Sequence, residues 1–415
     1  ILSIIGGVVV AYGYNNDYRR AGGYRPSSRN KVKRRNMRRI RNRAIIILSG
    51  LVVCVIAVAI VVGMVKLISN IASCNSTATI PTATAASASK AEKKNTQKKS
   101  VLTFTTPKIE ETSSEAGQYF QDSGLYVWDK KAFELFYGSD SKAKEYAELM
   151  NSAKQKLGKD VNVYSMIIPN HTEMGLPSKY KNTENGVTTN SQADYIKTSY
   201  EAMNSDVKYV NAYNNLADHC NEYIYFSSDH HWTGLGAYYA YEAFVKQTKQ
   251  TPVSLSALTE NKIEGFTGSF TGLTTAKLDT DTVYFWSMPF DVTNTITQAD
   301  GIILETETMY YWGEGAGSNS YGVFLFGDNP LEVIKSKAET ASDEKIAIVH
   351  ESYGNALVPY FAANYSEIHS IDFRSFSGDL KTYCKENGIK NVLFANGVMS
   401  SATETQLQSM RGILG

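Results

Sequence analysis

Cysteine and proline are scarce in this chain, and neither sign of charge dominates it. The 415 residues include 4 Cys and 9 Pro, and 42 Lys and Arg stand against 41 Asp and Glu. Four cysteines are too few for a disulfide-stapled scaffold, and none of them forms a C-x-x-C pair, so we expect no cysteine-ligated metal site. Hydrophobic residues make up 43% of the sequence, which is ordinary for a packed core and excludes wholesale disorder.

The even charge balance conceals a basic N-terminal arm. Residues 1–43 contain twelve Lys or Arg and a single acidic residue, Asp17. The next 22 residues, 44–65, carry no charge, and as a helix they would span roughly 33 Å, enough for the ~30 Å hydrocarbon core of a bilayer. We therefore expect a transmembrane helix within 44–68. The basic residues before it predict that the arm is cytoplasmic and the rest extracytoplasmic. Contact with anionic lipid explains the basic arm, so no nucleic-acid partner is expected.

Two points about the anchor stay open at this stage. Cys74 follows Ile-Ala-Ser as in a bacterial lipobox, which allows lipidation, although the apolar stretch before it is long for a signal peptide. Residues 1–12 are apolar but too short to cross a membrane, so they allow an earlier helix ending there. Residues 75–118 are rich in Ser, Thr, Ala and Lys without apolar periodicity, and they predict a disordered linker.

Residues 119–415 have the pattern of one extracytoplasmic α/β domain. Apolar runs predict buried strands at 161–168, 207–210, 223–226, 345–349, 368–373 and 391–394, and helical patterns lie at 132–157, 192–204, 236–248 and 356–363. This alternation predicts a largely parallel sheet with helices on both faces. Residues 250–340 are different, because they have Gly-rich turns and alternating segments, and there we expect a β-rich insertion.

Polar residues follow three of the predicted strands, at the edge where open parallel sheets bind ligands. Ser352 comes at a strand-to-helix turn, which would present its hydroxyl beside backbone N–H groups able to stabilise an oxyanion. A neutral serine needs a base within about 3 Å and a carboxylate to orient that base. Asp229 with His231, or less favourably with His230, supplies both groups in one short loop.

These residues also have ordinary structural roles that the sequence leaves open. Ser352 and Asp229 could each cap the helix that follows, and His230 could be purely structural. Trp232 could pack under the loop or offer a face to a sugar. Four further residues are secondary candidates, as oxyanion donors, substrate contacts or structural groups: Tyr353, Asn355, Arg374 and Asn396.

Several motifs in order resemble the DHHW protein family. They are Asp-His-His-Trp at 229–232, Glu-Ser-Tyr-Gly-Asn-Ala at 351–356 and Ile-Asp-Phe-Arg at 371–374, and the likeness extends over nearly all of 120–400. This bacterial family is similar to the alginate O-acetylation proteins, within the SGNH-hydrolase-like set. The resemblance implies a three-layer α/β/α fold and a catalytic triad of Ser352, His231 and Asp229, with no metal and no cofactor. One departure is Glu351, where the family commonly has Asp.

The resemblance also implies a function and its partners. It implies a membrane-anchored extracytoplasmic O-acyltransferase, usually for acetyl groups, or an acetylesterase, acting on a cell-surface polysaccharide. A polytopic membrane-bound O-acyltransferase would supply the acyl group. One alternative is a non-catalytic polysaccharide-binding module of the same fold. The other is a metal-dependent phosphoesterase, which would need further Asp and His ligands that do not follow the strands at 161–168 and 207–210.

Overall fold

The computed structural model describes residues 2–5, 8–11, 102–182, 186–312 and 320–415, which belong to two units, 1–96 and 97–415. In the first unit, β1 (Leu2–Ile5) and β2 (Val8–Ala11) pair as antiparallel strands. The predicted transmembrane segment, Cys74 and most of the basic arm lie outside the described residues. Within the described residues, no helix has both the length and the apolar character needed to cross a membrane.

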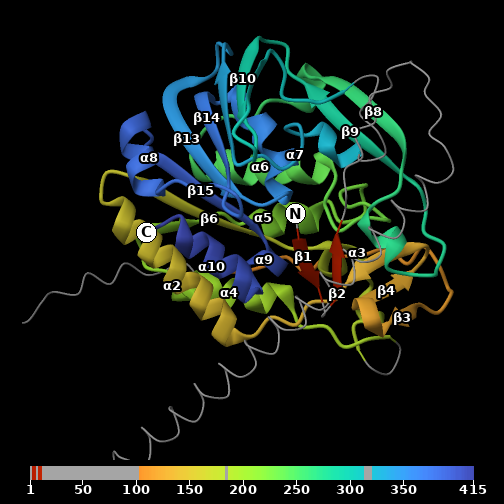
Figure 1. Ribbon diagram of the computed structural model, residues 1–415. Helices are drawn as coiled ribbons and strands as arrows, with labels where there is room; N and C mark the ends of the chain where they lie inside the picture. The colour runs from red at the N-terminus through yellow and green to blue at the C-terminus, as the bar shows by residue number, and fades with distance from the viewer. Residues whose placement is uncertain (1, 6–7, 12–101, 183–185, 313–319) are drawn as a thin grey trace, which may run out of the picture. The chain divides into compact units, whose positions relative to one another are not determined.

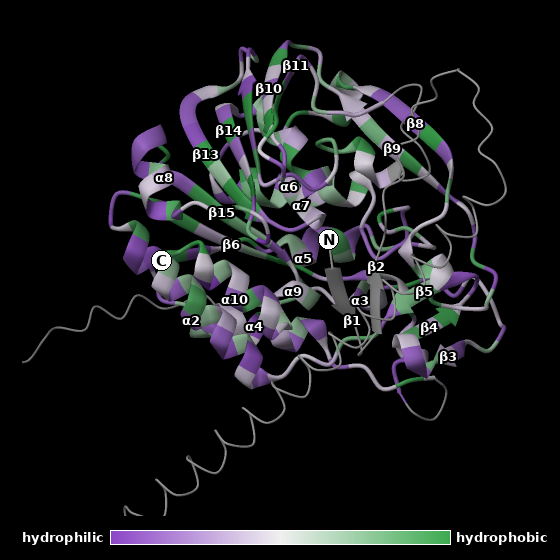
Figure 2. Ribbon diagram, viewed as in Figure 1, coloured by the Kyte–Doolittle hydropathy of each residue, from purple (hydrophilic) through white to green (hydrophobic). Residues whose placement is uncertain are grey.

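The second unit is built on an eight-stranded sheet of mixed direction (Figure 1). Five strands run parallel, in the spatial order β14 (Tyr365–Asp372), β13 (Ser342–His350), β15 (Asn391–Gly397), β6 (Asn162–Ile168) and β7 (Val207–Tyr209). Neighbouring residues of β13, from Ile346 to Val349, are all fully buried, so both faces of the sheet are covered there. A strand that is covered on both faces needs apolar residues at successive positions. Figure 2 shows such residues in green at the centre of the sheet.

The other three strands continue the same sheet in antiparallel fashion. β12 (Leu331–Ser336) pairs with β14, β10 (Val292–Thr297) pairs with β12, and β11 (Ile303–Thr306) forms the edge. Residues 250–340, where a β-rich insertion is expected, thus contribute three of their described strands to the main sheet. Only β8 (Thr259–Phe266) and β9 (Asp281–Ser287) form a ribbon of their own. Alternating apolar residues indicate a strand without indicating its partner.

Helices cover the sheet in two groups, on opposite faces in Figure 1. One group surrounds α2 (Asp140–Leu157) and contains α4 (Gln192–Ala202), α8 (Leu380–Asn387), α9 (Val398–Ala402) and α10 (Glu404–Gly412). The other contains α5 (Ala212–Asp218), α6 (Gly234–Gln247) and α7 (Tyr353–Leu357), which is followed by the short 3-10 helix η6 (Val358–Ala363).

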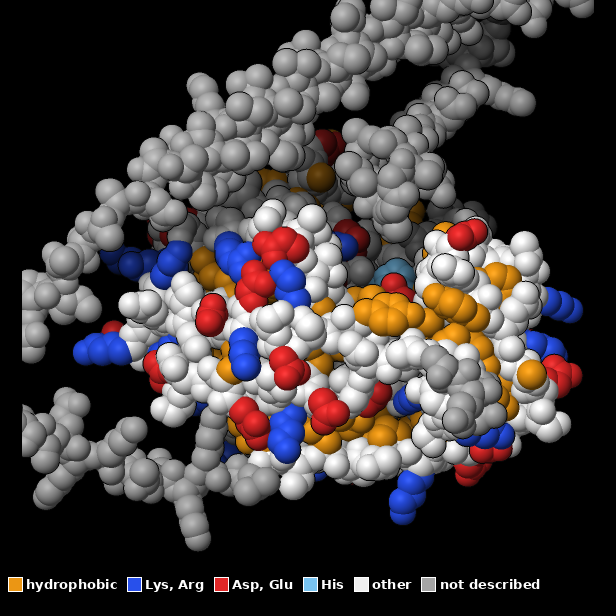
Figure 3. Space-filling model, turned by 90° about the horizontal axis from the view of Figure 1, so that it is seen from below, with side chains coloured by type: hydrophobic (Ala, Val, Ile, Leu, Met, Phe, Trp, Pro, Cys, Tyr) orange, Lys and Arg blue, Asp and Glu red, His pale blue; other side chains and the backbone are white. Residues whose placement is uncertain are grey.

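The helix predicted at 132–157 begins later than expected. Residues 131–134 form a strand, β5 (Lys131–Glu134), and Ser139 caps α2 by accepting the Lys142 backbone N–H at 3.4 Å. On the outer side of this layer, α2 and α10 are joined by the ion pairs of Arg411 with Glu145 and of Lys142 with Glu404. Figure 3 shows Lys, Arg, Asp and Glu side chains interspersed on the face seen from below, without a large area of one sign.

A small three-stranded sheet lies beside the main one. β3 (Gln118–Phe120), β4 (Leu125–Trp128) and β5 pair in order, with α3 (His171–Gly175) packed against β5. The β4–β5 turn uses Asp129 and Lys130 at φ 50° and 57°, as in a two-residue hairpin turn. The Ala132 backbone N–H bonds to the Ser227 carbonyl at 2.9 Å, which ties this sheet to the loop that carries Asp229.

Residues 102–117, which we call the strap, have no helix or strand but lie along the domain. Leu102 and Phe104 pack against the main core. Asn214 accepts the Thr105 N–H at 2.9 Å and donates to the Thr103 carbonyl at 3.2 Å. Asn221 makes the same pair of bonds with Glu110 and Lys108, at 2.9 and 2.8 Å. The described part of the predicted linker is therefore held on the domain by backbone contacts.

Candidate active site

Ser352 lies where β13 ends and α7 begins. Its backbone is helical, at φ −51° and ψ −23°, and its side chain makes no capping bond to the helix. Its hydroxyl instead lies 2.7 Å from Nε2 of His231, 121 residues earlier in the chain. The backbone N–H groups of Ser352 and Tyr353 have no hydrogen-bond partner within the described residues. The side chain of Ser352 therefore does not cap α7, which was the alternative role for this residue.

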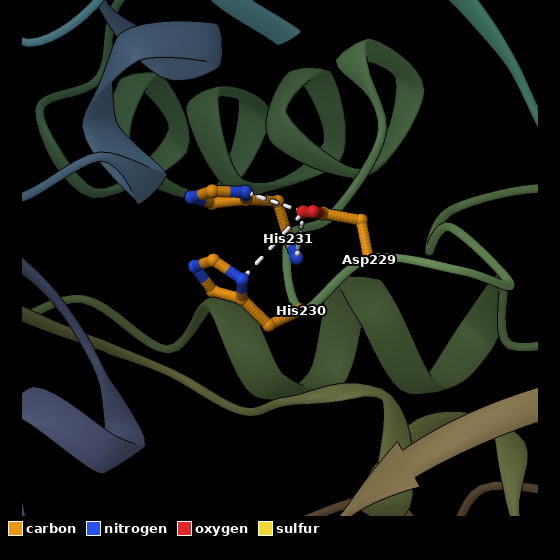
Figure 4. Close-up of side chains that lie close together, drawn as sticks. All are labelled: Asp229, His230 and His231. Carbon is orange, nitrogen blue, oxygen red and sulfur yellow. Dashed lines mark hydrogen bonds and ion pairs between the residues drawn. The ribbon is translucent and has the colours of Figure 1, made fainter. Parts of the chain in front are cut away.

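His231 is oriented by Asp229, as Figure 4 shows. Oδ1 of Asp229 lies 2.6 Å from Nδ1 of His231 and accepts the His231 backbone N–H at 3.0 Å. Burial would raise the pKa of Asp229, but the charge of His231 and its hydrogen bond outweigh burial and hold that pKa well below its usual range. An ionised Asp229 favours the imidazole tautomer that is protonated at Nδ1, which leaves Nε2 as the acceptor facing Ser352.

The second carboxylate oxygen of Asp229 is held by the turn at 268–270, about 40 residues later in the chain. It accepts the Ser269 backbone N–H at 2.8 Å. The preceding residue must be glycine, because a Cβ on Gly268 would lie 2.2 Å from the Cβ of Asp229. Asp229 does not cap α6, since Thr233 does so by accepting the Gly236 N–H at 3.3 Å. The Gly-Ser-Phe turn at 268–270 therefore positions Asp229 through the Ser269 backbone N–H.

The loop carrying Asp229 does not follow a sheet strand as predicted. Residues 223–226 form no regular strand and make a single bridge, from Tyr225 to Trp232. Their backbone pairs with the returning loop, since the Thr233 N–H bonds to the Ile224 carbonyl at 3.0 Å. The run is buried and apolar as a strand would be, but its hydrogen-bond partner is local.

Asp281, at the start of β9, was not recognised from the sequence. Its buried carboxylate accepts four hydrogen bonds, from the Tyr223 hydroxyl at 2.6 Å, the backbone N–H groups of Ser227 and Ser228 at 2.9 and 2.8 Å, and the Ser228 hydroxyl at 2.5 Å. These bonds fix the two residues directly before Asp229. An acidic residue opening an alternating strand gives no sequence signal of partners more than 50 residues away.

Three aromatic side chains enclose the triad. The Tyr321 ring stacks on His231 with centroids 3.9 Å apart and an interplanar angle of 7°, and its hydroxyl donates to the Ser352 carbonyl at 3.0 Å. The Tyr353 hydroxyl donates to the His230 carbonyl. Trp232 is fully buried and donates from Nε1 to the Tyr353 carbonyl at 2.9 Å, so it packs under the loop and offers no face to a sugar. No role was predicted for Tyr321 from the sequence.

The charged residues near the triad are paired with one another. Arg374 donates to both oxygens of Asp372, at 2.6 to 3.2 Å, and lies 2.9 Å from Asp328. Burial would lower the pKa of Arg374, but its bonds to these two carboxylates raise it. The Asn355 amide donates to Asp328 at 2.8 Å. The side chains of Arg374 and Asn355 thus serve an ion-pair network beside the site, while the Asn355 backbone N–H donates to the Ser352 carbonyl at 3.1 Å.

Behind Ser352, Glu351 is buried with polar partners. It accepts the Gly397 N–H at 2.8 Å and the Asn396 amide at 3.3 Å, and burial raises its pKa. Asn396 also accepts the Tyr146 hydroxyl at 3.0 Å, so its amide is directed into the core. Glu351, which departs from the family pattern, is therefore hydrogen-bonded to Gly397 and Asn396.

One more carboxyl group belongs to these surroundings. Burial raises the pKa of Glu134, on β5, to about 7, and its charge interacts with those of His231 and Asp229. It was missed because one acidic residue within an apolar run gives no sequence signal.

A cation could in principle use the ligand atoms of Asp229, His230 and His231, which lie within 4.8 Å of one another. Both oxygens of Asp229 already accept N–H groups, however, and its bond to His231 is a direct 2.6 Å hydrogen bond. A metal would have to replace these bonds, so the donor set fits a triad better than a metal centre.

Comparison with known proteins places the chain in a family. The model of the DHHW protein family matches residues 58–371. A solved DHHW family protein from Eubacterium siraeum is 30% identical, with a TM-score of 0.65, over 72% of this chain and 100% of that chain. The search of curated proteins gives no match.

More distant structures are also similar. Bacillus cereus PatB1, solved with a sulfonyl adduct, has 18% identity and a TM-score of 0.57 over 68% of this chain and 97% of that chain, so it shares the mixed α/β fold. The O-acetyltransferase domain of Pseudomonas putida AlgJ has 12% identity and a TM-score of 0.38 over 72% of this chain and 98% of that chain. The extent of the family match, together with the identity to the Eubacterium siraeum protein, shows that this chain belongs to the DHHW protein family.

Proposed function

We propose that this protein is a serine-dependent O-acyltransferase that moves acyl groups, acetyl in the simplest case, onto hydroxyl groups of a cell-surface polysaccharide. The observation that carries the proposal is the continuous hydrogen-bonded line from Asp229 through His231 to Ser352, at 2.6 and 2.7 Å. An ionised carboxylate, an oriented imidazole and a serine hydroxyl within hydrogen-bond reach are the arrangement that activates a serine nucleophile.

The reaction proceeds in two balanced halves. His231 Nε2 takes the Ser352 proton while Oγ attacks the carbonyl of an acyl ester, and the departing alcohol takes that proton as the ester bond breaks. The acyl group is then held as an ester on Ser352. An acceptor hydroxyl gives its proton to His231, attacks this ester and releases Ser352, which recovers the proton. Water as the acceptor would give an esterase.

Charge develops on the carbonyl oxygen in both halves. The unpartnered N–H groups of Ser352 and Tyr353 support a role as donors to this oxygen, at the N-terminal end of α7. The secondary candidates Asn355 and Asn396 are less suited to it, because their amides bind Asp328 and Glu351.

The cellular setting is part of the same proposal. The segment 44–68, whose first 22 residues carry no charge, would anchor the protein in the cell membrane, with the basic arm 1–43 inside and the domain 119–415 outside. A polytopic membrane protein would then supply the acyl group. The argument for acyl transfer itself stands on the geometry of Asp229, His231 and Ser352.

The test is covalent labelling of the full chain with phenylmethanesulfonyl fluoride, followed by peptide mass spectrometry. PatB1 has been solved with a sulfonyl adduct, and we expect one at Ser352 here. Ser352→Ala should abolish labelling and lower aryl acetate hydrolysis by about a thousandfold or more. The exposed Ser375→Ala variant is the matched control and should behave as the parent protein. An unlabelled Ser352, or equal hydrolysis rates for the parent and Ser352→Ala, would reject the proposal.

A further inference from the structure

His230 lies beside the triad without belonging to it. Its ring centroid is 3.8 Å from that of His231, with an interplanar angle of 37°. Figure 4 shows that the two rings point in the same direction, with Nδ1 of each toward Asp229 and Nε2 of each on the opposite side. The Nε2 atom of His231 faces the Ser352 hydroxyl there. The Nε2 atom of His230 is therefore presented on the side where the reaction would take place.

The position of His230 is fixed, yet its outer nitrogen is free to bind. Its Nδ1 atom lies 2.8 Å from the Ser269 hydroxyl, and its carbonyl accepts the Tyr353 hydroxyl. Within the described residues, its Nε2 atom has no hydrogen-bond partner. The side chain is 38% exposed, compared with 8% for that of His231. A histidine that is held at one nitrogen and open at the other is arranged as a binding group.

The surroundings of the ring determine what it can bind. Burial, followed by the neighbouring charge of His231, lowers the pKa of His230 to about 4, so the ring is neutral at pH 7. Oδ1 of Asp229 lies 3.7 Å from Nδ1, and this negative charge favours the proton on that nitrogen. Nε2 is then a lone-pair acceptor, which suits a hydroxyl donor and does not suit an oxyanion.

We propose that His230 binds the hydroxyl neighbouring the one that is acylated, so that the acceptor is a vicinal diol such as a sugar ring presents. This inference rests on the proposed acyl transfer. One hydroxyl of the diol would give its proton to His231 while the adjacent hydroxyl donates to His230. The close spacing of the two rings matches two donors on neighbouring carbon atoms.

The experiment compares two acceptors that differ by one hydroxyl. The full chain is given 4-nitrophenyl acetate as donor, with either cis-1,2-cyclohexanediol or cyclohexanol, and the acetylated alcohols are measured by gas chromatography. We expect the parent protein to acetylate the diol roughly fivefold to tenfold faster per hydroxyl than cyclohexanol. This ratio corresponds to the free energy of about one hydrogen bond. His230→Phe, which keeps a ring but removes both nitrogens, should reduce this preference to about one. His230→Asn, whose side-chain carbonyl can accept, should keep part of it.

The control is His219→Phe. His219 stacks on Tyr239 and lies 2.6 Å from Glu222, outside the site, so this variant should keep the parent preference. Equal use of both alcohols by the parent, an unchanged preference in His230→Phe, or no acetylated alcohol from a protein that still hydrolyses the donor would each overturn the inference. If sulfonyl labelling at Ser352 accompanies any of these three outcomes, Ser352 remains the proposed nucleophile and only the role of His230 is rejected. If Ser352 is not labelled, the proposed function itself is rejected.

Discussion

The two halves of the eight-stranded sheet place their polar residues differently. In the parallel half, β13 leads directly into Glu351 and Ser352 at its carboxyl end, where the hydroxyl meets His231. In the antiparallel half, β10 and β12 bury Asn294 and Glu332 against each other at 2.7 Å within the sheet. Parallel strands bring successive carboxyl ends to one edge, while antiparallel neighbours end at opposite edges. We therefore expect substitutions at the parallel edge to alter activity more than stability, and buried substitutions in the antiparallel half to do the reverse.

The largest expected effect is that of Asp229→Asn. Without the carboxylate, His231 loses the partner that fixes its tautomer, and kcat for aryl acetate hydrolysis should fall by about a thousandfold to ten-thousandfold. Steady-state kinetics of the full chain measure this. Asp206→Asn, at an exposed loop position, is the control and should keep parent kinetics. A fall smaller than tenfold would show that Asp229 does not orient the base.

Asp281→Asn tests whether the β8–β9 ribbon supports the catalytic edge. The new amide would place its N–H groups against two of the four donors, and unsatisfied buried groups cost about 1–3 kcal/mol. We expect a loss of a few kcal/mol of unfolding free energy, together with a roughly tenfold to hundredfold loss of kcat, because the residues before Asp229 would shift. Chemical denaturation and kinetics report the two effects. The exposed Asp279→Asn should change neither, and loss of stability with full activity would separate Asp281 from the site.

Glu332→Gln examines the antiparallel half through the dependence of stability on pH. Burial raises the pKa of Glu332 to about 8, from an ordinary value of 4.5. Between these values the folded state keeps a proton that the unfolded state releases, so the contribution of Glu332 to stability falls as pH rises from about 4.5 to 8 and is constant above that. The Gln variant cannot ionise, so it should lose less stability over this range, by on the order of 2–4 kcal/mol.

The measurement is the unfolding free energy at several pH values from 5 to 9. Glu339→Gln, at an exposed position, should follow the parent curve. Parallel curves for the parent and Glu332→Gln would mean that Glu332 titrates normally. Aryl acetate hydrolysis should be unaffected by Glu332→Gln, in line with the contrast between the two halves.

The smallest effect should come from Tyr321→Phe. Tyr321 lies in the connection between β11 and β12, so it is the point where the antiparallel half contacts the triad. The variant keeps the ring on His231 and removes the bond from its hydroxyl to the Ser352 carbonyl, worth about 1 kcal/mol. We expect a roughly fivefold fall in kcat, with Tyr311→Phe as the exposed control. Unchanged kinetics would leave Tyr321 with a packing role alone.

The central residues of the site could be predicted from local motifs. Contacts between segments far apart in the chain could not. Ser352 and the Asp229–His231 pair were each recognisable from a short segment, because a strand-to-helix serine and a carboxylate next to an imidazole are local patterns. The parallel strands β6, β13, β14 and β15 were recognisable for the same reason, as largely buried apolar runs, whereas β7 buries Val207 and exposes Lys208.

The contacts that were missed depend on partners far along the chain. Asp281 acts on residues 53 and 54 positions earlier, and β12 joins the sheet through β14 rather than through a neighbour in sequence. The first residues of the predicted helix at 132–157 became β5 because pairing with β4 prevailed over their helix-like spacing. The position of Trp232 could not be predicted either, since nothing in the sequence distinguishes a buried indole from one that is exposed to a sugar.

The strap contacts have a consequence for how this protein can vary. Asn214 and Asn221 each bind one N–H and one carbonyl of the strap, so they recognise its main chain and not its side chains. Relatives are therefore free to differ in side chain at the four positions these asparagines bind, 103, 105, 108 and 110, while the chain keeps the same path and Phe104 packs against the main core. Proline is the exception at positions 105 and 110, because it has no N–H to give to either asparagine.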